Sequence, residues 1–217
     1  MPAGSDNPSS VRPGSPTTAR FAGVLLAGGS SRRMGRPKAA LRVGGRTFAA
    51  CALELLRSAG LRPLVVVAGE HFEQTRSALP TDVHLRLLRN PCPERGQLHS
   101  LKIALRSLDS DPEISGAMVT LVDHPLVQPG TAHALLSVAR TDGIAVPCYR
   151  GRRGHPVVFG RELFSELLET ADEAGARAVV RRLPARVTTT EVEDPGILRD
   201  IDTPGEYARL SPEEKLR

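Results

Sequence analysis

An apolar run that ends in a loop of glycines and cations constrains this chain more than any other feature. Residues 21–27 are apolar, and the loop that follows, up to Lys38, holds three glycines, two serines and three arginines. Glycines let backbone N–H groups approach phosphate oxygens that a Cβ would keep away, and arginine and lysine neutralise phosphate charge. The segment therefore predicts a strand and a loop that binds the phosphates of a nucleotide. A mobile, solvated basic loop is the alternative that composition leaves open.

Two common nucleotide-binding patterns do not fit this loop. The P-loop needs Gly-Lys followed by Ser or Thr, whereas Lys38 follows a proline and precedes an alanine. The pattern G-x-G-x-x-G needs a helix that begins within the glycines, but Pro37 and Gly44-Gly45 postpone any helix to about Thr47. A different nucleotide-binding fold is therefore required.

The 217-residue chain is expected to form one domain with a tail at each end. Residues 1–19 are rich in Pro, Ser, Gly and Thr, which predicts a disordered tail; residues 20–210 form the domain, and residues 211–217 a C-terminal tail. The N-terminal segment has no apolar signal region, and no stretch approaches the roughly 20 apolar residues of a membrane span. These features predict a cytoplasmic protein that does not insert into a membrane.

The charge balance favours an anionic small substrate over nucleic acid. The net charge is +5, but basic residues are interspersed with acidic ones, and only 3% of the residues are aromatic, which is poor material for base stacking. Three cysteines that lie far apart in the sequence argue against a disulfide framework or a zinc site. We therefore expect no nucleic-acid partner.

Short β-branched runs alternate with helical segments along the domain. Strands are expected at Phe21–Ala27, Pro63–Ala68, Val83–Leu88, Ala117–Val122, Gly143–Pro147 and Arg186–Val192. Helices are expected between an N-cap at Thr47 and Gly60, and at Glu70–Ala78, Leu98–Leu108, Pro129–Ala139, Arg161–Glu169, Ala174–Arg182 and Pro204–Leu210. This alternation predicts a single α/β domain with a mainly parallel, Rossmann-like sheet and helices on both faces. Ligands of such sheets bind at the carboxyl ends of the strands.

Two carboxylates are candidate ligands for Mg²⁺. Asp123 follows a strand-like run and precedes His124 and a proline, so it lies at the sheet edge that faces the phosphate loop. Asp202 precedes a Thr-Pro pair that could open the last helix. Magnesium keeps several waters and takes one or two protein carboxylates. The alternatives are that Asp123 caps the following turn and that Asp202 is an N-cap signal. His124 is expected to shape the site rather than act as a base.

Two other segments carry polar groups. Residues 96–101 open a helix with Gln97 and Ser100, which suit contacts with a base or ribose or serve merely as caps. Residues 149–156 resemble a hairpin turn between two strands, with Arg153 and His155 near its tip. This turn could bind a second anionic substrate or be a solvated turn. No H-E-x-x-H or G-x-S-x-G pattern is present, so zinc chemistry and hydrolytic triads have little support.

The phosphate loop carries a family resemblance. Residues 26–38 read L-A-G-G-S-S-R-R-M-G-R-P-K and resemble the signature L-A-[AG]-G-x-S-x-R-[MF]-G-x-x-K. That signature is typical of nucleotidyltransferases with a glycosyltransferase-A-like, or nucleotide-diphospho-sugar transferase, fold. The chain most resembles the MobA-like NTP transferases, and among them the molybdenum cofactor cytidylyltransferases, over about residues 20–210. Further matches in family order are Asn90, Gly96, Ser100-Leu101, Asp123, Pro125, Val146-Pro147, Gly154-His155-Pro156, Gly175-Ala176-Arg177, Gly196-Ile197-Leu198 and Asp200-Ile201-Asp202-Thr203-Pro204.

Several positions depart from the family pattern. Val122 and His124 flank Asp123, where the family has Gly or Cys before and Gln or Met after the aspartate. Glu173 stands where the family has Asp. The Leu-Ala-Gly-Gly segment is closer to the guanylyltransferase form, whereas Gly-His-Pro and Asp-Ile-Asp-Thr-Pro resemble the cytidylyltransferase. The resemblance therefore leaves CTP and GTP as alternatives.

The resemblance implies an Mg²⁺-dependent transfer of a nucleoside monophosphate from CTP or GTP to a phosphorylated acceptor, with release of pyrophosphate. Molybdopterin is the acceptor that the resemblance favours. A transient contact with a molybdoenzyme would accompany that role. The nucleotide is expected to bind the loop residues Leu26, Ala27, Gly28, Gly29, Ser30 and Arg33, with its α-phosphate and the leaving pyrophosphate at Lys38 and its base or ribose at Gln97 and Ser100. Arg153 and His155 are expected to bind the acceptor, and Asp123 and Asp202 to bind Mg²⁺. Of these, Arg33, Lys38 and Asp123 are expected to be catalytic.

Two other functions remain as alternatives. One is an enzyme of the same fold that activates a sugar 1-phosphate or a similar metabolite. The other is a nucleotide-binding chaperone that delivers a cofactor to a molybdoenzyme without turnover. The presence of Lys38, Asp123 and Asp202 together argues against the chaperone, because binding alone does not demand all three.

Overall fold

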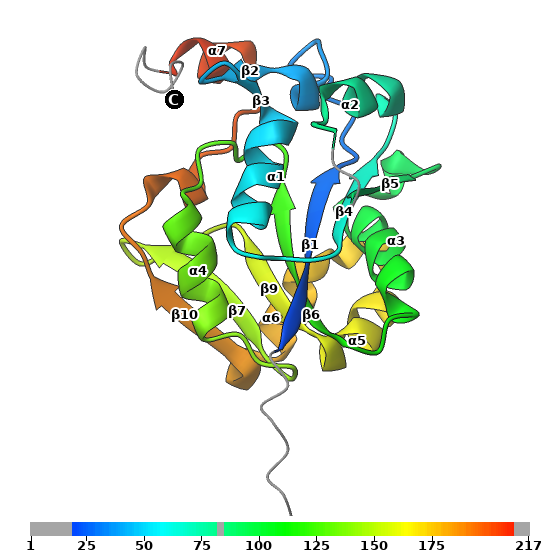
Figure 1. Cartoon of the computed structure of the whole chain (residues 1–217), viewed down its shortest axis with the longest axis vertical. Helices are drawn as coiled ribbons and strands as arrows, with labels where there is room; N and C mark the ends of the chain where they lie inside the picture. Colours follow the sequence, from blue (N-terminus) through cyan, green and yellow to red (C-terminus); the bar gives the residue numbers. More distant parts are fainter. Residues whose placement is uncertain (1–18, 82–84, 211–217) are drawn as a thin grey trace, which may run out of the picture.

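The computed structural model describes residues 19–81 and 85–210. Within them the centre of the molecule is a sheet of eight strands, in the order β10-β7-β9-β6-β1-β4-β5 with β8 paired to β7 (Figure 1). The strands are β1 (Arg20–Ala27), β4 (Leu64–Ala68), β5 (Leu85–Arg89), β6 (Ile114–Leu121), β7 (Ile144–Tyr149), β8 (Arg152–Arg153), β9 (Val157–Gly160) and β10 (Val187–Glu191). A separate small sheet pairs β2 (Arg42–Val43) with β3 (Arg46–Thr47). The pairs β1–β4, β1–β6, β4–β5 and β7–β10 are parallel, and the pairs of β9 with β6 and β7 are antiparallel.

Helices cover both faces of the sheet. The longer helices are α1 (Phe48–Ser58), α2 (Phe72–Ala78), α3 (Gln97–Asp109), α4 (Pro129–Ser137) and α6 (Ala176–Arg182), and the shorter ones are α5 (Phe164–Glu169) and α7 (Pro204–Ala208). Figure 1 shows α1 and α4 on the near face and α5 and α6 behind the sheet. The predicted α/β fold, with a mainly parallel sheet between two helical layers, is confirmed.

The side chains of β1 explain this layered arrangement. Phe21 and Leu25 belong to the core beneath α1, while Ala22, Val24 and Leu26 belong to the core beneath α3 and α5. Alternate residues of a strand point to opposite faces, so a strand that is apolar at every position is buried on both sides. The apolar run of the sequence is thus the central strand of a two-sided core.

Most of the predicted elements exist with bounds that differ by a few residues. Thr47 caps α1, because its hydroxyl accepts a hydrogen bond from the N–H of Ala50 at 3.0 Å, and Gly60 follows the helix with a φ of 74°. The strand predicted at Val83–Leu88 begins at Leu85 in the structure, and residues 83 and 84 lie outside the described residues. Residues 1–18 of the predicted N-terminal tail (1–19) and the predicted C-terminal tail (211–217) also lie outside them.

The structure corrects three details of the prediction. A 3₁₀ turn at Lys38–Ala40 follows Pro37 directly, so helical structure begins before Thr47; buried Ala39 anchors this turn to the core. Segment 161–169 divides into a 3₁₀ turn at Arg161–Leu163 and α5. The strand β9 was not predicted, because only four residues pair between β6 and β7.

The turn predicted in residues 149–156 is a hairpin between β7 and β8. Its two connecting residues, Arg150 and Gly151, have φ values of 50° and 74°. Positive φ at both central positions is typical of the tight hairpin turns that match the twist of the strands. The hairpin holds Arg153 on an exposed two-residue strand.

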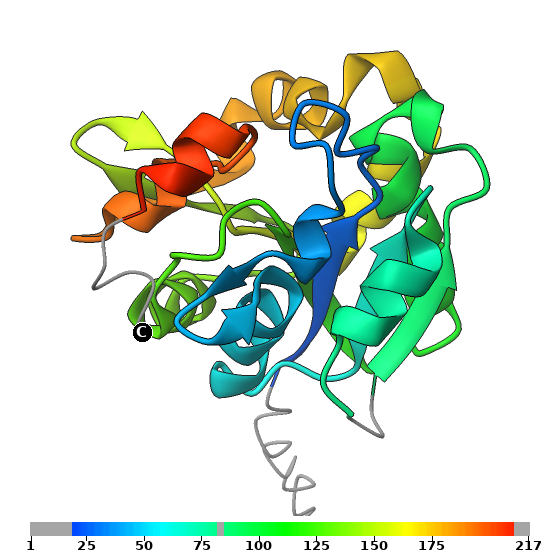
Figure 2. The same cartoon turned by 90° about the horizontal axis from the view of Figure 1, so that it is seen from above.

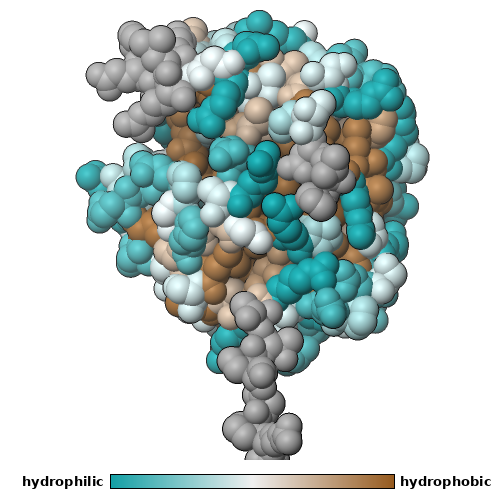
Figure 3. Space-filling view, viewed as in Figure 1, coloured by the Kyte–Doolittle hydropathy of each residue, from teal (hydrophilic) through white to brown (hydrophobic). Residues whose placement is uncertain are grey.

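One face of the molecule mixes hydrophobic and hydrophilic side chains at its surface. Figure 3 shows hydrophobic patches interrupted by hydrophilic side chains on the face that carries α1 and α4. Among the described residues, no helix is long and apolar enough to cross a bilayer.

Candidate active site

A cavity of about 560 Å³ lies at the carboxyl ends of β1 and β6. Seen from above in Figure 2, the loop after β1 (blue) and α7 (red) lie at this same end of the molecule. The predicted residues that line the cavity are Leu26, Ala27, Gly28, Gly29, Ser30, Arg33, Lys38, Gln97, Ser100, Asp123 and Asp202. The fold therefore brings the phosphate loop, the start of α3 and both candidate carboxylates to one place. Arg153 and His155 are not among the lining residues.

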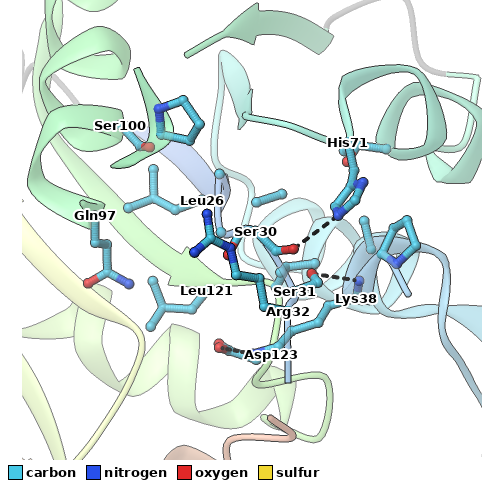
Figure 4. Close-up of a pocket in the computed structure, with 18 of the residues that line it drawn as sticks. Leu26, Ser30, Ser31, Arg32, Lys38, His71, Gln97, Ser100, Leu121 and Asp123 are labelled. Carbon is cyan, nitrogen blue, oxygen red and sulfur yellow. Dashed lines mark hydrogen bonds and ion pairs between the residues drawn. The ribbon is translucent and has the colours of Figure 1, made fainter. Parts of the chain in front are cut away.

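Lys38 is the centre of this cavity's charged wall. Its Nζ lies 3.0 Å from Oδ2 of Asp123 and also donates to Oδ1 of Asp202, as Figure 4 shows in part. The exposed Arg33 reaches the other oxygen of Asp202. The backbone N–H of Lys38 donates to the hydroxyl of Ser31 at 3.2 Å, which joins the two ends of the phosphate loop. The two carboxylates thus meet two of the loop's cations, Arg33 and Lys38.

The ionic partners set the protonation states of this wall. Burial alone would lower the pKa of Lys38, but the two carboxylates outweigh burial and raise that pKa above its ordinary value. Burial alone would raise the pKa of Asp202, but the hydrogen bond and charge of Lys38, with the charge of Arg33, lower it. At neutral pH the lysine is therefore an ammonium ion and Asp202 a carboxylate.

The two carboxylates fit a divalent cation. Oδ1 of Asp123 is buried and has no hydrogen-bond partner among the described residues, and Asp202 reaches the same lysine from another segment of the chain. Within those residues no group of three His, Cys, Asp or Glu side chains forms a metal cluster. Two carboxylates beside a cavity that can admit phosphates and water match the habit of magnesium, which takes few protein ligands.

The contacts of these two aspartates differ from the helix cap and turn cap that were the alternatives for them. Thr203, not Asp202, is the N-cap of α7: its hydroxyl accepts from the N–H of Glu206, and the Glu206 carboxylate accepts in return. Asp123 uses one oxygen for Lys38, while its other oxygen has no hydrogen-bond partner in the described part of the chain. Both carboxylates are held by the phosphate loop.

The start of α3 forms the opposite wall of the cavity. Gln97 and Ser100 line it, and the Ser100 hydroxyl accepts a hydrogen bond from the buried Asn90 side chain at 2.9 Å. A Cβ on Gly28 would lie 2.5 Å from that hydroxyl oxygen. Glycine at position 28 therefore lets the loop approach α3 more closely than a residue with a side chain would. Figure 4 shows Gln97 and Ser100 across the cavity from Lys38 and Asp123.

Sequence reasoning missed a third wall, formed by α2 and the loop before it. His71 and Thr75 line the cavity, and Nε2 of His71 lies 3.0 Å from the carbonyl oxygen of Ser30. The loop after β4 also ends at the carboxyl edge of the sheet. Applying the rule for strand ends to this loop, as for the others, would have identified His71.

The predicted acceptor residues lie beside this cavity rather than in its wall. The rings of His155 and His124 are 5.1 Å apart between centroids, and Nδ1 of each is buried without a hydrogen-bond partner among the described residues. Burial, with the nearby charges of His124 and Arg177, lowers the pKa of His155 to about 4. His124 is buried next to Asp123, which is consistent with a shaping role. Arg153 is exposed on β8.

Comparison with protein families gives a match over most of the domain. The model of the MobA-like NTP transferase domain matches residues 23–187. The purine catabolism protein PucB of Bacillus subtilis (strain 168) is 32% identical over 193 residues, covering 85% of this chain and 93% of PucB. The nicotine blue oxidoreductase of Paenarthrobacter nicotinovorans is 30% identical over 197 residues, 87% of this chain and 95% of that protein.

Two molybdenum cofactor enzymes are also similar. The molybdenum cofactor guanylyltransferase of Rhizobium meliloti (strain 1021) is 28% identical over 209 residues, 94% of this chain and 93% of that protein. The molybdenum cofactor cytidylyltransferase of Escherichia coli (strain K12) is 22% identical over 184 residues, 85% of this chain and 92% of that protein. The family therefore includes relatives with either base in their names.

Solved structures share the fold. The crystal structure of Rv0371c from Mycobacterium tuberculosis H37Rv superposes with a TM-score of 0.77 at 29% identity, covering 88% of this chain and 98% of that one. A complex of Rv0371c with manganese has a TM-score of 0.70 at 27% identity, with the same coverage. A nucleotidyl transferase from Methanothermobacter has a TM-score of 0.74 at 22% identity, covers 88% of this chain and 95% of that one, and shows the fold alone.

Proposed function

Because the chain belongs to the MobA-like NTP transferase domain family, we propose that it transfers a nucleoside monophosphate from CTP or GTP to molybdopterin and releases pyrophosphate. The observation that carries this proposal is the wall in which Lys38 binds both Asp123 and Asp202 beside a glycine-rich loop. Each of these groups has a natural partner in a metal-bound nucleoside triphosphate. The lysine matches the phosphates, and the carboxylates match the cation.

The reaction needs alignment and charge neutralisation more than proton transfer. An oxygen of the acceptor phosphate attacks the α-phosphorus of the nucleotide, the bond to the bridging oxygen breaks, and pyrophosphate leaves. The attacking phosphate is an anion at neutral pH, so no general base is required. Lys38 stabilises the charge that develops on the α-phosphate and on the leaving group. Gly28, Gly29, Ser30 and Arg33 hold the β- and γ-phosphates.

Asp123 and Asp202 would hold a magnesium ion at this wall. When bound, that ion neutralises phosphate charge and orients the triphosphate for in-line attack. Oδ1 of Asp123, which has no hydrogen-bond partner among the described residues, and the manganese complex of Rv0371c support a divalent cation here. In the absence of a cation, Lys38 keeps the two carboxylates together.

The remaining residues divide between the two substrates. Gln97 and Ser100, on the wall opposite Lys38, contact the base or ribose. Arg153 and His155 contact the acceptor: His155 lies against His124, the neighbour of Asp123, and so faces the α-phosphate side of the site. The similarity to molybdenum cofactor guanylyl- and cytidylyltransferases supports molybdopterin as the acceptor. The protein acts in the cytoplasm, where a molybdoenzyme can collect the product.

The test is pyrophosphate release from CTP and, separately, from GTP, with Mg²⁺ and purified molybdenum cofactor. Pyrophosphate release from one of the two nucleotides with the wild type, and none with an Asp123→Ala variant, would establish the reaction and identify the nucleobase. The same assay with a panel of sugar 1-phosphates examines the rival acceptor. Nucleotide binding without pyrophosphate release from any acceptor would contradict the proposal and favour a chaperone.

A further inference from the structure

A second charged cluster lies outside the cavity lining and surrounds the side chain of Asp172, which is 1% exposed. Oδ2 of Asp172 lies 2.6 Å from Nη2 of Arg95 and 3.1 Å from Nδ1 of His99. Oδ1 lies 2.7 Å from Nζ of Lys102. Lys102 is itself buried and also donates to the carbonyl oxygen of Thr170 at 2.6 Å. Asp172 and Lys102, whose side chains are 1% and 9% exposed, are stable in the interior only when they satisfy one another.

The three donors to Asp172 come from one continuous segment, and that segment is the nucleotide wall. Arg95 belongs to the 3₁₀ turn Pro93–Arg95, while His99 and Lys102 lie on the first turns of α3. Pro93, Gly96, Gln97 and Ser100 of this segment line the cavity. The side chains that face the cavity therefore alternate with side chains that bind Asp172.

The wall has little local support of its own. Neither the 3₁₀ turn nor α3 has a side-chain hydrogen bond at its N-cap, and the residue between them, Gly96, has a φ of 89° that favours glycine. A helix start without a capping side chain leaves its first N–H groups to other partners and frays more readily. The ion pairs to Asp172 supply the support from outside.

We infer that Asp172 is a positioning residue for the nucleotide: through Arg95, His99 and Lys102 it holds the Pro93–Ser100 wall at the distance from the phosphate loop that a base and ribose require. This inference rests on the proposed function. Asp172 touches no substrate and acts through the wall. Loss of its contacts weakens nucleotide binding and leaves the chemistry at Lys38 and Asp123 intact.

Arg95→Gln is the decisive variant, because Arg95 is 55% exposed and its removal leaves Asp172 paired with Lys102 and His99. The matched control is Arg140→Gln, which removes another exposed arginine, 68% exposed, that forms an ion pair with Asp142 at 2.8 Å. Both variants lose one positive charge. Titration calorimetry with CTP and GTP measures the dissociation constants, and thermal unfolding measures stability.

Arg95→Gln is expected to weaken binding of the preferred nucleotide roughly three- to tenfold, the scale of one supporting ion pair. In turnover assays the KM for that nucleotide rises while kcat stays within about twofold. The control variant retains wild-type values, and Arg95→Lys restores part of the affinity. The unfolding temperatures of the two glutamine variants remain similar.

Equal nucleotide affinity in Arg95→Gln, Arg140→Gln and the wild type would overturn the inference while leaving the proposed function intact. Equal losses in the two glutamine variants would also overturn it, because the effect would then come from net charge. A wild-type protein that binds neither CTP nor GTP would overturn both the proposed function and this inference.

Discussion

The molecule holds two clusters of ion pairs, and they differ in whether their side chains can exchange an ion-pair partner for a ligand. At the cavity, two carboxylates meet Lys38 and the exposed Arg33, and one oxygen of Asp123 has no hydrogen-bond partner in the described residues. Around Asp172, one buried carboxylate is enclosed by three donors of the same chain segment. The first cluster borders the cavity, so phosphates and a cation can replace its ion-pair partners. In the second cluster the carboxylate itself is 1% exposed, so it supports its neighbours and does not take up a ligand.

This difference teaches how one domain separates a reactive site from the scaffold that aims it. A site that must accept charged ligands keeps its ionic groups near solvent, where exchange of partners is cheap. A support must not exchange partners, and burial of an ion-paired carboxylate makes each exchange costly.

The largest effect is expected at the cavity cluster, in catalysis. Lys38→Ala removes the cation that faces the developing charge, and we expect kcat to fall roughly a thousandfold, the scale of one preorganised electrostatic group. Pyrophosphate release at saturating nucleotide and Mg²⁺ measures this. Turnover within tenfold of the wild type would show that the cluster is not the reactive one.

The Asp172 cluster should dominate stability instead. Asp172→Asn leaves the buried ammonium of Lys102 without its carboxylate, and we expect the free energy of unfolding to fall by about 3 kcal/mol. Asp202→Asn should cost less than about 1 kcal/mol, because Lys38 keeps Asp123 and the group lies nearer to solvent. Urea unfolding of both variants gives the comparison. Similar losses in the two would remove the distinction between site and scaffold.

The sequence predicted the first cluster and not the second, for a physical reason. Lys38, Asp123 and Asp202 follow a glycine loop, a strand end and a Thr-Pro pair, each of which has a local signature, and the topology of parallel strands brings such ends together. Asp172 directly precedes the family match at residues 173–177, but no pattern marked Asp172 itself. Its donors become visible only when α3 packs against residues 170–174, a contact that neither segment encodes alone.

The same reasoning explains which parts of the fold the sequence predicted. The central strands are continuous apolar runs, and α1 has a clear helical period with Thr47 at its start, so both were predicted. The strand β9 was missed because its four residues are defined by pairing with β6 and β7 rather than by length. The loop after β4 was not considered, although it follows the same strand-end rule, and His71 was missed with it.

A third test concerns His155, a buried group at the edge of the cavity cluster. Its pKa is lowered to about 4, mainly by burial, whereas an unfolded histidine titrates near 6.5. Between these two values the unfolded chain binds more protons than the folded one, so stability falls as the pH drops from 6.5 to 4. The contribution of this one group is about 3 kcal/mol.

His155→Gln should remove that part of the pH dependence. Unfolding free energies of the variant and the wild type, measured between pH 4 and 7, should differ by an amount that changes across this window and is constant above it. Parallel curves would mean that His155 titrates normally in the folded protein. The buried edge of the cavity would then be wetter than its geometry implies.

The smallest expected effect comes from the cap beside Asp202. The Thr203 hydroxyl accepts from the N–H of Glu206, and the Glu206 carboxylate accepts from the N–H groups of Thr203 and Asp202 at 2.8 and 2.9 Å. Thr203→Ala should lower the free energy of unfolding by about 1 kcal/mol through loss of this capping box. It should also loosen Asp202 and raise the Mg²⁺ concentration needed for half-maximal activity.

Thr47→Ala is the matched control, because Thr47 caps α1 through an equivalent bond to Ala50 far along the chain from Asp202. We expect a similar loss of stability and an unchanged Mg²⁺ requirement. If both variants shift the Mg²⁺ requirement equally, general destabilisation accounts for the shift. If only Thr203→Ala shifts it, the orientation of Asp202 depends on the cap. The cluster at the cavity is then positioned by hydrogen bonds to the backbone, whereas the Asp172 cluster is positioned by ion pairs.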